Sequence, residues 1–476
     1  MENRYLEPDA DTRKGLLSKV IEFTEEYIKI VEENNVKPYY MGTNKGSGLR
    51  ASSIHEHGAD LDDILTTYKD HVLREGLQMQ HGHNFVYQLC GSTFSSALAS
   101  YLASRTNPFP GQFVSCPGAV RMENMIIEWA AGLMGFPKGF GGNITSGGSM
   151  ATLLAITAAR ENANVLAKDF HRLVIYATRC TNSCLNKALL TIGLKEAVIR
   201  NIPIDSDYQI DTENLRKTIE RDTEAGLIPF LIGASIGRTV TGSVDPIGEL
   251  ADIAHEYNVW LHVDAAYGGF LVLAEELKSC FKDVYRVDSI IMDPHKALFV
   301  PFGHGIVILK NGGLLKACYG SHKWYFDSAY PPEEEDSPLD LSIETSKPFR
   351  ALTIWLPLKL HGVGAFRSYL QEKVLLARYL FKNMKETPGF CVGPYPHLTV
   401  VLFKYDTGDK TKNDKFNRRL QKIIMQDYGF NLSANVVNGE VYIRACVLNM
   451  YTNIKTVDKL ISSIKLSVAT IQQEFL

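Results

Sequence analysis

The sequence predicts an α/β protein built on a mostly parallel sheet that is covered by helices on both faces. From residue 172 onward, short strands rich in Val, Ile and Leu alternate with helices. Near-continuous apolar strands are typical of a parallel sheet whose two faces are both buried. In such sheets ligands bind beyond the carboxyl ends of the strands. The expected strands are 173–176, 197–200, 229–234, 259–263, 289–292 and 305–309, with helices expected at 184–193, 212–221 and 247–257.

Length and pattern also predict how the rest of the chain is organised. A chain of 476 residues is long enough for two or three domains. Residues 11–36 form an amphipathic helical pattern with no partner nearby in sequence, as in an arm that packs elsewhere. We expect an N-terminal helical arm or segment (1–95), a large α/β domain (96–370) and a small C-terminal α+β domain (371–476).

Composition excludes several classes of protein. The net charge of −3 gives no electrostatic basis for binding nucleic acid, and no apolar run approaches the length of a membrane span. The eight cysteines are scattered and complete no zinc-binding pattern, so we expect no metal site. The first residues carry no basic and apolar leader pattern. These features favour a cytoplasmic protein with reduced thiols.

A glycine-rich segment, 140–152, leads directly into an apolar helical stretch. Gly147 and Gly148 let the backbone approach a ligand, and Ser149 adds a hydroxyl beside the free N–H groups of the helix start. Such a start binds anions. The segment matches neither a dinucleotide-binding nor an NTP-binding glycine pattern. Its alternative interpretation is a flexible turn without a ligand.

The most reactive candidate is Lys296, which follows a predicted strand. Residues 289–292 form a short apolar run that ends at Asp293 and Pro294, and another apolar run follows the lysine. Burial lowers the pKa of an amine and makes it a nucleophile for a Schiff base. On this segment alone, a surface lysine with a buried stem fits equally well.

Motifs along most of the chain resemble those of the group II amino-acid decarboxylases, which use pyridoxal 5'-phosphate (PLP). Residues 263–269 include Asp264, and Lys296 follows 296 − 264 = 32 residues later in Asp-Pro-His-Lys. Further matches lie at 145–149, 237–246, 349–352, 358–362 and 442–449. The resemblance implies the fold type I architecture, with a mostly parallel sheet of the seven-stranded type, and an active site shared by the subunits of a homodimer.

The same resemblance implies a role for each matching residue. Lys296 would hold PLP as a Schiff base, and Asp264 would keep the pyridine nitrogen protonated, so that the ring accepts electrons from a quinonoid intermediate. The other implied cofactor-binding residues are Gly147, Gly148, Ser149, Thr239, Ala266, Asp293 and His295. Tyr87, Phe109 and Arg350 are the implied substrate-binding residues.

Several positions depart from the family pattern. Asn182 stands where the family carries a catalytic His that stacks on the cofactor ring, and an amide does not transfer protons as imidazole does. Met150 replaces a usual Glu, and Asp293 a usual Asn. A loop Tyr that protonates the substrate carbon in the aromatic-amino-acid members falls near Pro338. Tyr325 or Tyr330 could substitute for it only if the loop is built differently.

These observations lead to three hypotheses. The first is PLP-dependent decarboxylation of an L-amino acid, with an aromatic side chain favoured by Tyr87 and Phe109. Gly111 stands where aromatic-substrate members place a bulky group, which widens the pocket, and no basic cluster favours glutamate. The second hypothesis couples decarboxylation to O2-dependent oxidative deamination and gives an aldehyde. The third is a PLP-binding homologue without turnover, which an intact Lys296 and Asp264 disfavour.

Overall fold

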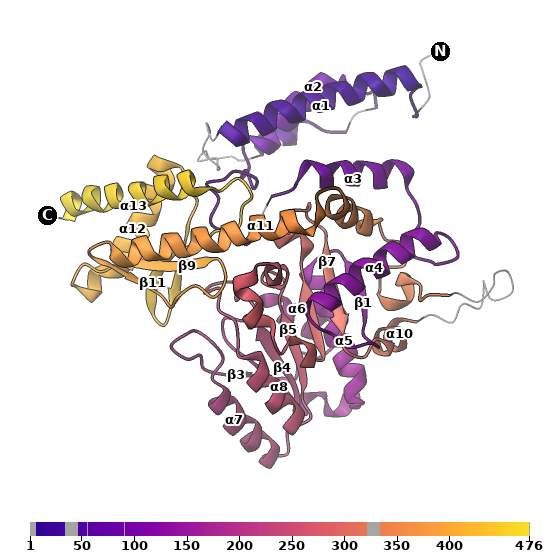
Figure 1. Cartoon of the computed structure of the whole chain (residues 1–476), viewed down its shortest axis with the longest axis vertical. Coiled ribbons are helices and arrows are strands. Elements are labelled where there is room, and N and C mark those ends of the chain that lie inside the picture. Colours follow the sequence, from indigo (N-terminus) through magenta and orange to yellow (C-terminus); the bar gives the residue numbers. More distant parts are fainter. Residues whose placement is uncertain (1–5, 34–45, 55, 90, 321–333, 476) are drawn as a thin grey trace. The chain divides into compact units, whose positions relative to one another are not determined.

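The computed structural model describes residues 6–33, 46–54, 56–89, 91–320 and 334–475 (Figure 1). The chain divides into two compact units. Unit 1 comprises 1–87, 407–443 and 449–476, and unit 2 comprises 88–406 and 444–448. The domain boundaries expected from the sequence, at 95/96 and 370/371, stay predictions.

Unit 2 contains a seven-stranded sheet in the order β1-β7-β6-β5-β4-β2-β3. Its strands are β1 (Gly141–Thr145), β2 (Leu173–Ala177), β3 (Val198–Asn201), β4 (Ile228–Ser235), β5 (Trp260–Asp264), β6 (Ser289–Met292) and β7 (Gly305–Leu309). The five strands from β3 to β6 in this order pair in parallel, whereas β7 is antiparallel to both β6 and β1. The predicted mostly parallel sheet is confirmed.

Strand β1 lies within the glycine-rich segment and is not predicted by the sequence. Glycine is depleted in strands because it contributes no side-chain packing and loses much backbone entropy. Here the pairing with β7 requires glycine, because a Cβ on Gly142 would lie 2.5 Å from the carbonyl oxygen of Val307. A close approach of two backbones therefore overrides the local propensity.

Helices flank this sheet (Figure 1). They are α4 (Pro117–Leu133), α5 (Gly148–Ala163), α6 (Ser183–Thr191), α7 (Thr212–Glu224), α8 (Ile247–Glu256), α9 (Pro294–Ala297) and α10 (Gly313–Tyr319), while α3 (Phe94–Thr106) packs against α11 (Arg350–Glu386). Helix α5 packs on α6 and on β7 and β6 over a buried apolar core. Helix α11 is broken at Gly362, whose φ of 72° is left-handed.

Outside the large sheet, unit 2 also holds β8 (Phe390–Val392), paired antiparallel with β9 (Val400–Tyr405). Unit 1 contains α1 (Ala10–Glu33), α2 (Leu61–Tyr68), α12 (Lys410–Tyr428), β10 (Ser433–Val437) and α13 (Ile454–Phe475). Strand β11 (Glu440–Cys446) begins in unit 1 and ends in unit 2. Among the described residues, no helix combines the length and the apolar character needed to cross a membrane.

The sheet brings the ends of β5 and β6 to one edge. The two strands pair in parallel with Asp264 opposite Ile291, so Asp293 follows two residues beyond that level. Beside them, the turn that carries Thr239 is held by a buried ion pair, in which Arg238 Nη2 lies 2.6 Å from Asp245 Oδ1. Side chains with chemical functions therefore gather at the carboxyl edge, as the sequence predicts.

Candidate active site

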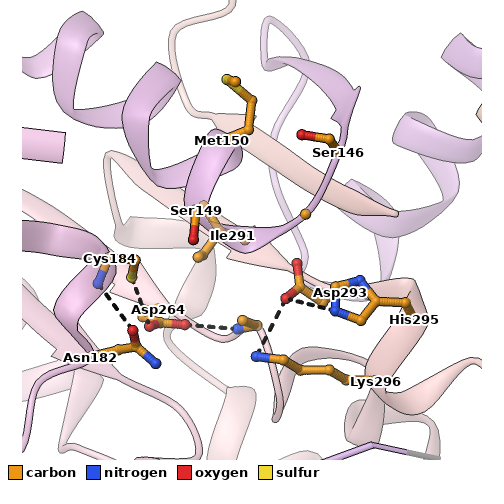
Figure 2. A pocket seen from close by; sticks show the side chains of 13 residues that line it. Ser146, Ser149, Met150, Asn182, Cys184, Asp264, Ile291, Asp293, His295 and Lys296 are labelled. Carbon is orange, nitrogen blue, oxygen red and sulfur yellow. Dashed lines mark hydrogen bonds and ion pairs between the residues drawn. The ribbon is translucent and has the colours of Figure 1, made fainter. Parts of the chain in front are cut away.

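A cavity of about 330 Å³ opens at this edge, between the ends of β5 and β6 and the start of α5 (Figure 2). It is lined by Ser146, Gly147, Gly148, Ser149, Met150, Asn182, Cys184, Asp264, Ala266, Ile291, Asp293, His295 and Lys296. Lys296 and Asp264, which the sequence predicts as the Schiff-base lysine and the partner of the pyridine nitrogen, therefore line the same cavity.

The start of α5 forms one wall. Gly147 has a φ of 137°, a conformation that side-chain-bearing residues rarely adopt. A Cβ on Gly148 would lie 2.9 Å from Asp293 Oδ2, so this approach also requires glycine. The first N–H groups of a helix lack partners within the helix and carry partial positive charge. Together with Ser149 they can hold an anionic group.

Lys296 and Asp293 form an ion pair on the wall of the cavity that follows β6. Lys296 Nζ lies 3.4 Å from Asp293 Oδ2, and the carboxyl group is only 3% exposed (Figure 2). Burial is the main reason that the pKa of Asp293 is raised to about 7; the charge of Asp264 contributes to the rise, whereas Lys296 and a hydrogen bond from the Gly148 backbone oppose it. Asp293 Oδ1 has no hydrogen-bond partner within the described structure. A buried polar atom without a partner is costly, and here it marks a place for a ligand group.

His295 is held in its neutral form beside this pair. Burial lowers the pKa of its imidazole to about 4. Its Nδ1 therefore donates to the backbone carbonyl of His304 at 2.6 Å, which leaves Nε2 without a proton, 3.7 Å from Asp293 Oδ2. At neutral pH the imidazole consequently adds no positive charge to the cavity.

Asp264 receives two partners at the end of β5. Its Oδ1 accepts a hydrogen bond from Ala266 N at 3.0 Å, and its Oδ2 lies 3.8 Å from Cys184 Sγ. Burial, and then the Asp264 charge, raise the pKa of the Cys184 thiol to about 12, so the thiol keeps its proton and donates it to this carboxylate. Thr152 Oγ1 lies 3.6 Å from the same sulfur.

Cys184 is a site residue that the sequence reasoning missed. It is the second residue of α6, shortly after β2, so its place at the carboxyl edge of the sheet was the available signal. Ile291 also lines the cavity without having been singled out as a site residue.

Asn182 lines the cavity with an amide that is fixed at both ends. Its Oδ1 accepts from Cys184 N at 3.0 Å and so caps α6, while its Nδ2 donates to Thr239 Oγ1 at 3.3 Å. Asn is among the best residues for this capping position. The structure thus places Thr239 beside Asn182, although Thr239 does not line the cavity itself.

The three predicted substrate-binding residues do not line this cavity. Both outer nitrogens of Arg350 donate to Glu344 at 2.8 Å, so its guanidinium is already engaged. The Phe109 ring fills the space beside Gly111, where an added Cβ would lie 2.8 Å from Phe109 Cζ. Tyr87 is exposed and belongs to unit 1.

The loop positions considered for a proton donor divide into two groups. Tyr325 and Tyr330 lie outside the described residues. Pro338 begins a short 3₁₀ helix, η7 (Pro338–Leu341), and its carbonyl accepts a hydrogen bond from Asn143 Nδ2 at 2.9 Å. The segment that starts at Pro338 is therefore anchored to β1.

A PLP-dependent enzyme requires a lysine amine, a carboxylate and an anion-binding helix start around one cavity, and this cavity has all three. Residues 43–406 match the pyridoxal-dependent decarboxylase conserved domain. An aromatic-L-amino-acid decarboxylase of Bacillus atrophaeus is 31% identical over 417 residues, which cover 87% of this chain and 86% of that protein. The chain belongs to the pyridoxal-dependent decarboxylase family, and it is a PLP-dependent carboxy-lyase.

Other relatives extend the likeness. A phenylacetaldehyde synthase of Petunia hybrida is 27% identical over 468 residues, covering 93% of this chain and 91% of that protein. The crystal structure of Oryza sativa TDC with PLP and tryptamine superposes with a TM-score of 0.91 at 24% identity, covering 98% of this chain and 99% of that one. This superposition confirms the fold type I architecture.

The state of the Cys184 thiol can be tested by alkylation. At pH 8 we expect Cys184 to react with iodoacetamide at least about 100-fold more slowly than the exposed Cys391, because only the thiolate is nucleophilic. Peptide mass spectrometry after timed labelling measures both rates, and the protein unfolded in guanidinium is the control in which the rates converge. Equal rates in the native protein would contradict the buried, protonated thiol.

Proposed function

We propose that this chain decarboxylates an aromatic L-amino acid and holds PLP in the 330 Å³ cavity. The observation that carries the proposal is the convergence of Lys296, Asp264 and the start of α5 on that cavity. PLP is an electron sink that stabilises negative charge on the substrate carbon after CO2 leaves.

The donor set of the cavity fits the cofactor. The turn formed by Gly147, Gly148 and Ser149 would bind the phosphate, since helix starts with free N–H groups bind anions. Lys296 would form the covalent link through its amine. Asp264 would pair with the pyridine nitrogen, and its fixed contacts with Ala266 N and Cys184 hold the carboxylate in place for that role.

The remaining lining residues have supporting roles in this proposal. Ala266 and Ile291 would present apolar surface to the cofactor ring and exclude water from it. His295, which is neutral and fixed by the His304 carbonyl, would bound the phosphate end. Thr239 would act through Asn182, because the two side chains are hydrogen bonded.

An aromatic substrate is supported by the names of the relatives, which include decarboxylases of aromatic L-amino acids. We propose that Phe109 and Tyr87 border the substrate. Arg350 would meet the substrate carboxylate only if its pairing with Glu344 opened, since that pairing uses both outer nitrogens.

Replacement of the lysine tests the proposal. Lys296→Arg keeps the positive charge but cannot form the covalent link, so we expect decarboxylation to fall at least about 1,000-fold and the visible absorption of the bound cofactor to be lost. Lys310→Arg, at the end of β7, is the matched control and should keep both properties. Release of ¹⁴CO2 from carboxyl-labelled Phe, Tyr and Trp measures the rate. Full activity of the Lys296→Arg variant would refute the assignment.

A second function, formation of an aldehyde, is favoured by Asn182. An amide that is hydrogen bonded at both ends cannot deliver a proton, so the substrate carbon stays unprotonated for longer and O2 can oxidise it. The balanced reaction consumes one O2 and one water, and gives one aldehyde, CO2, NH3 and H2O2. The similarity to a phenylacetaldehyde synthase supports it.

An oxygen electrode distinguishes amine from aldehyde formation. If the aldehyde is the product, O2 uptake equals CO2 release and peroxide accumulates in the same amount. Asn182→His supplies an imidazole and should shift the product toward the amine, with Asn162→His as a control outside the cavity. CO2 release without O2 uptake would exclude this second function.

We also propose a cytoplasmic homodimer. Exposed apolar side chains form a stripe on α1, and another stripe runs along α3: Leu16, Leu17, Val20 and Ile21, and Phe94, Leu98, Tyr101 and Leu102. Contiguous exposed apolar surface is typical of subunit interfaces. The described cysteines are free thiols, which favours the reducing cytoplasm. Sedimentation equilibrium should give twice the chain mass of 53.1 kDa. An active monomer would contradict the assembly.

A further inference from the structure

We infer that Asp293 and the phosphate group of the bound cofactor share one proton, so that cofactor affinity decreases as the pH rises. This inference rests on the proposed placement of the phosphate at the start of α5. It assigns to Asp293 a role as a proton-carrying partner of the phosphate.

The position of Asp293 is the first argument. Its Oδ2 lies 2.9 Å from the place a Cβ on Gly148 would take, and its Oδ1 lies 2.9 Å from the place a Cβ on Gly305 would take. The carboxyl group therefore sits against the helix start that holds the phosphate. A buried carboxylate and a phosphate dianion cannot stay close together while both are fully ionised, and like charges in one site retain a proton.

The hydrogen-bonding state of Asp293 is the second argument. Within the described structure its Oδ1 has no partner, although the side chain is 3% exposed. An ionised oxygen could only accept a hydrogen bond, and a phosphate oxygen offers none. A protonated Oδ1 could donate to the phosphate, which would satisfy the orphaned atom and remove the repulsion at once.

The surrounding groups supply too little positive charge to replace that proton. Lys296 faces Asp293 from α9 at 3.4 Å, but a single ammonium group cannot balance both an ionised Asp293 and a phosphate dianion. His295 and His304 are neutral near pH 7, because burial lowers the pKa of each imidazole to about 4. Asp264 on β5 adds negative charge, and the Cys184 thiol on α6 stays protonated.

The direction of the pH dependence follows from proton counting. A phosphate monoester has its second pKa near 6, and the pKa of Asp293 without cofactor is about 7. Above about pH 7.5 both groups are ionised before binding, so the complex must take up one proton from solvent. Because one proton is taken up on binding, the affinity for the phosphate-bearing ligand decreases about tenfold for each further pH unit.

Pyridoxine 5'-phosphate is the probe, because it carries the phosphate but no aldehyde, and its binding involves no covalent link to Lys296. We expect its Kd for the apoenzyme, measured by calorimetry, to rise about tenfold from pH 7.5 to 8.5. The amide of Asp293→Asn donates a hydrogen bond without titrating. We therefore expect the Kd of this variant to change less than about twofold between pH 7.5 and 8.5. At pH 8.5 it should be at least about tenfold lower than the Kd of the wild type. Asp288→Asn is the matched control, since Asp288 flanks the other end of β6 and its pKa is also raised by burial. It should behave as the wild type.

Each outcome decides between the possibilities. Equal pH dependence in the wild type and Asp293→Asn overturns the shared proton, whereas an absence of pyridoxine 5'-phosphate binding overturns the proposed cofactor site as well. If Asp293→Asn does not fold, the phosphorus-31 resonance of the wild-type holoenzyme decides. A shared proton keeps that resonance away from the dianion position at pH 7.5, and a resonance at the dianion position refutes the inference.

Discussion

The 3.4 Å pair between Lys296 and Asp293 at the end of β6 is the interaction on which the rest of the site depends. Parallel pairing of β5 and β6 brings Asp264 to the same edge, so two carboxylates and one amine share a small cavity. Buried charges need partners. Asp264 obtains them from Ala266 N and Cys184, while Asp293 is left with one oxygen unsatisfied.

Asp264 and Asp293 have different hydrogen-bond partners, and this difference suits the two carboxyl groups to different roles in the cavity. The oxygens of Asp264 are fixed by the neutral donors Ala266 N and Cys184 Sγ, which orient the carboxyl group for the proposed pairing with a ring nitrogen. Asp293 has its pKa raised toward neutrality, mainly by burial. Pairs of titratable groups in different environments commonly divide roles in this way. The two carboxylates therefore differ in their partners within a single cavity, and Asp293 is the one whose pKa is raised to about 7.

Most of the strands and the central pair of residues could be predicted from the sequence. Apolar runs such as 289–292 are strands, and Lys296 and Asp264 meet in one cavity because each follows such a run. Strand β1 could not be predicted, since its glycines are required by the close approach of β7, a tertiary contact. Cys184 was missed for a similar reason. Its contact with Asp264 joins residues 80 positions apart, and its position shortly after β2 does not by itself indicate that partner.

The pairing of Arg350 with Glu344 also depends on three-dimensional structure. A motif identifies Arg350, but only the fold shows that its guanidinium already has a carboxylate partner. The same holds for Asn182. The sequence shows that an imidazole is replaced, whereas the structure shows that the amide is fixed between the start of α6 and Thr239. Departures from a family pattern thus acquire a physical meaning only when their contacts are known.

The central claim is that one amine, that of Lys296, carries the cofactor. Borohydride reduction of the purified protein, followed by proteolysis and peptide mass spectrometry, locates the reduced cofactor on a particular lysine. The account predicts the added mass on the peptide that contains Lys296. The cofactor mass on a different lysine, such as the buried Lys347 or Lys373, or on none, would contradict it.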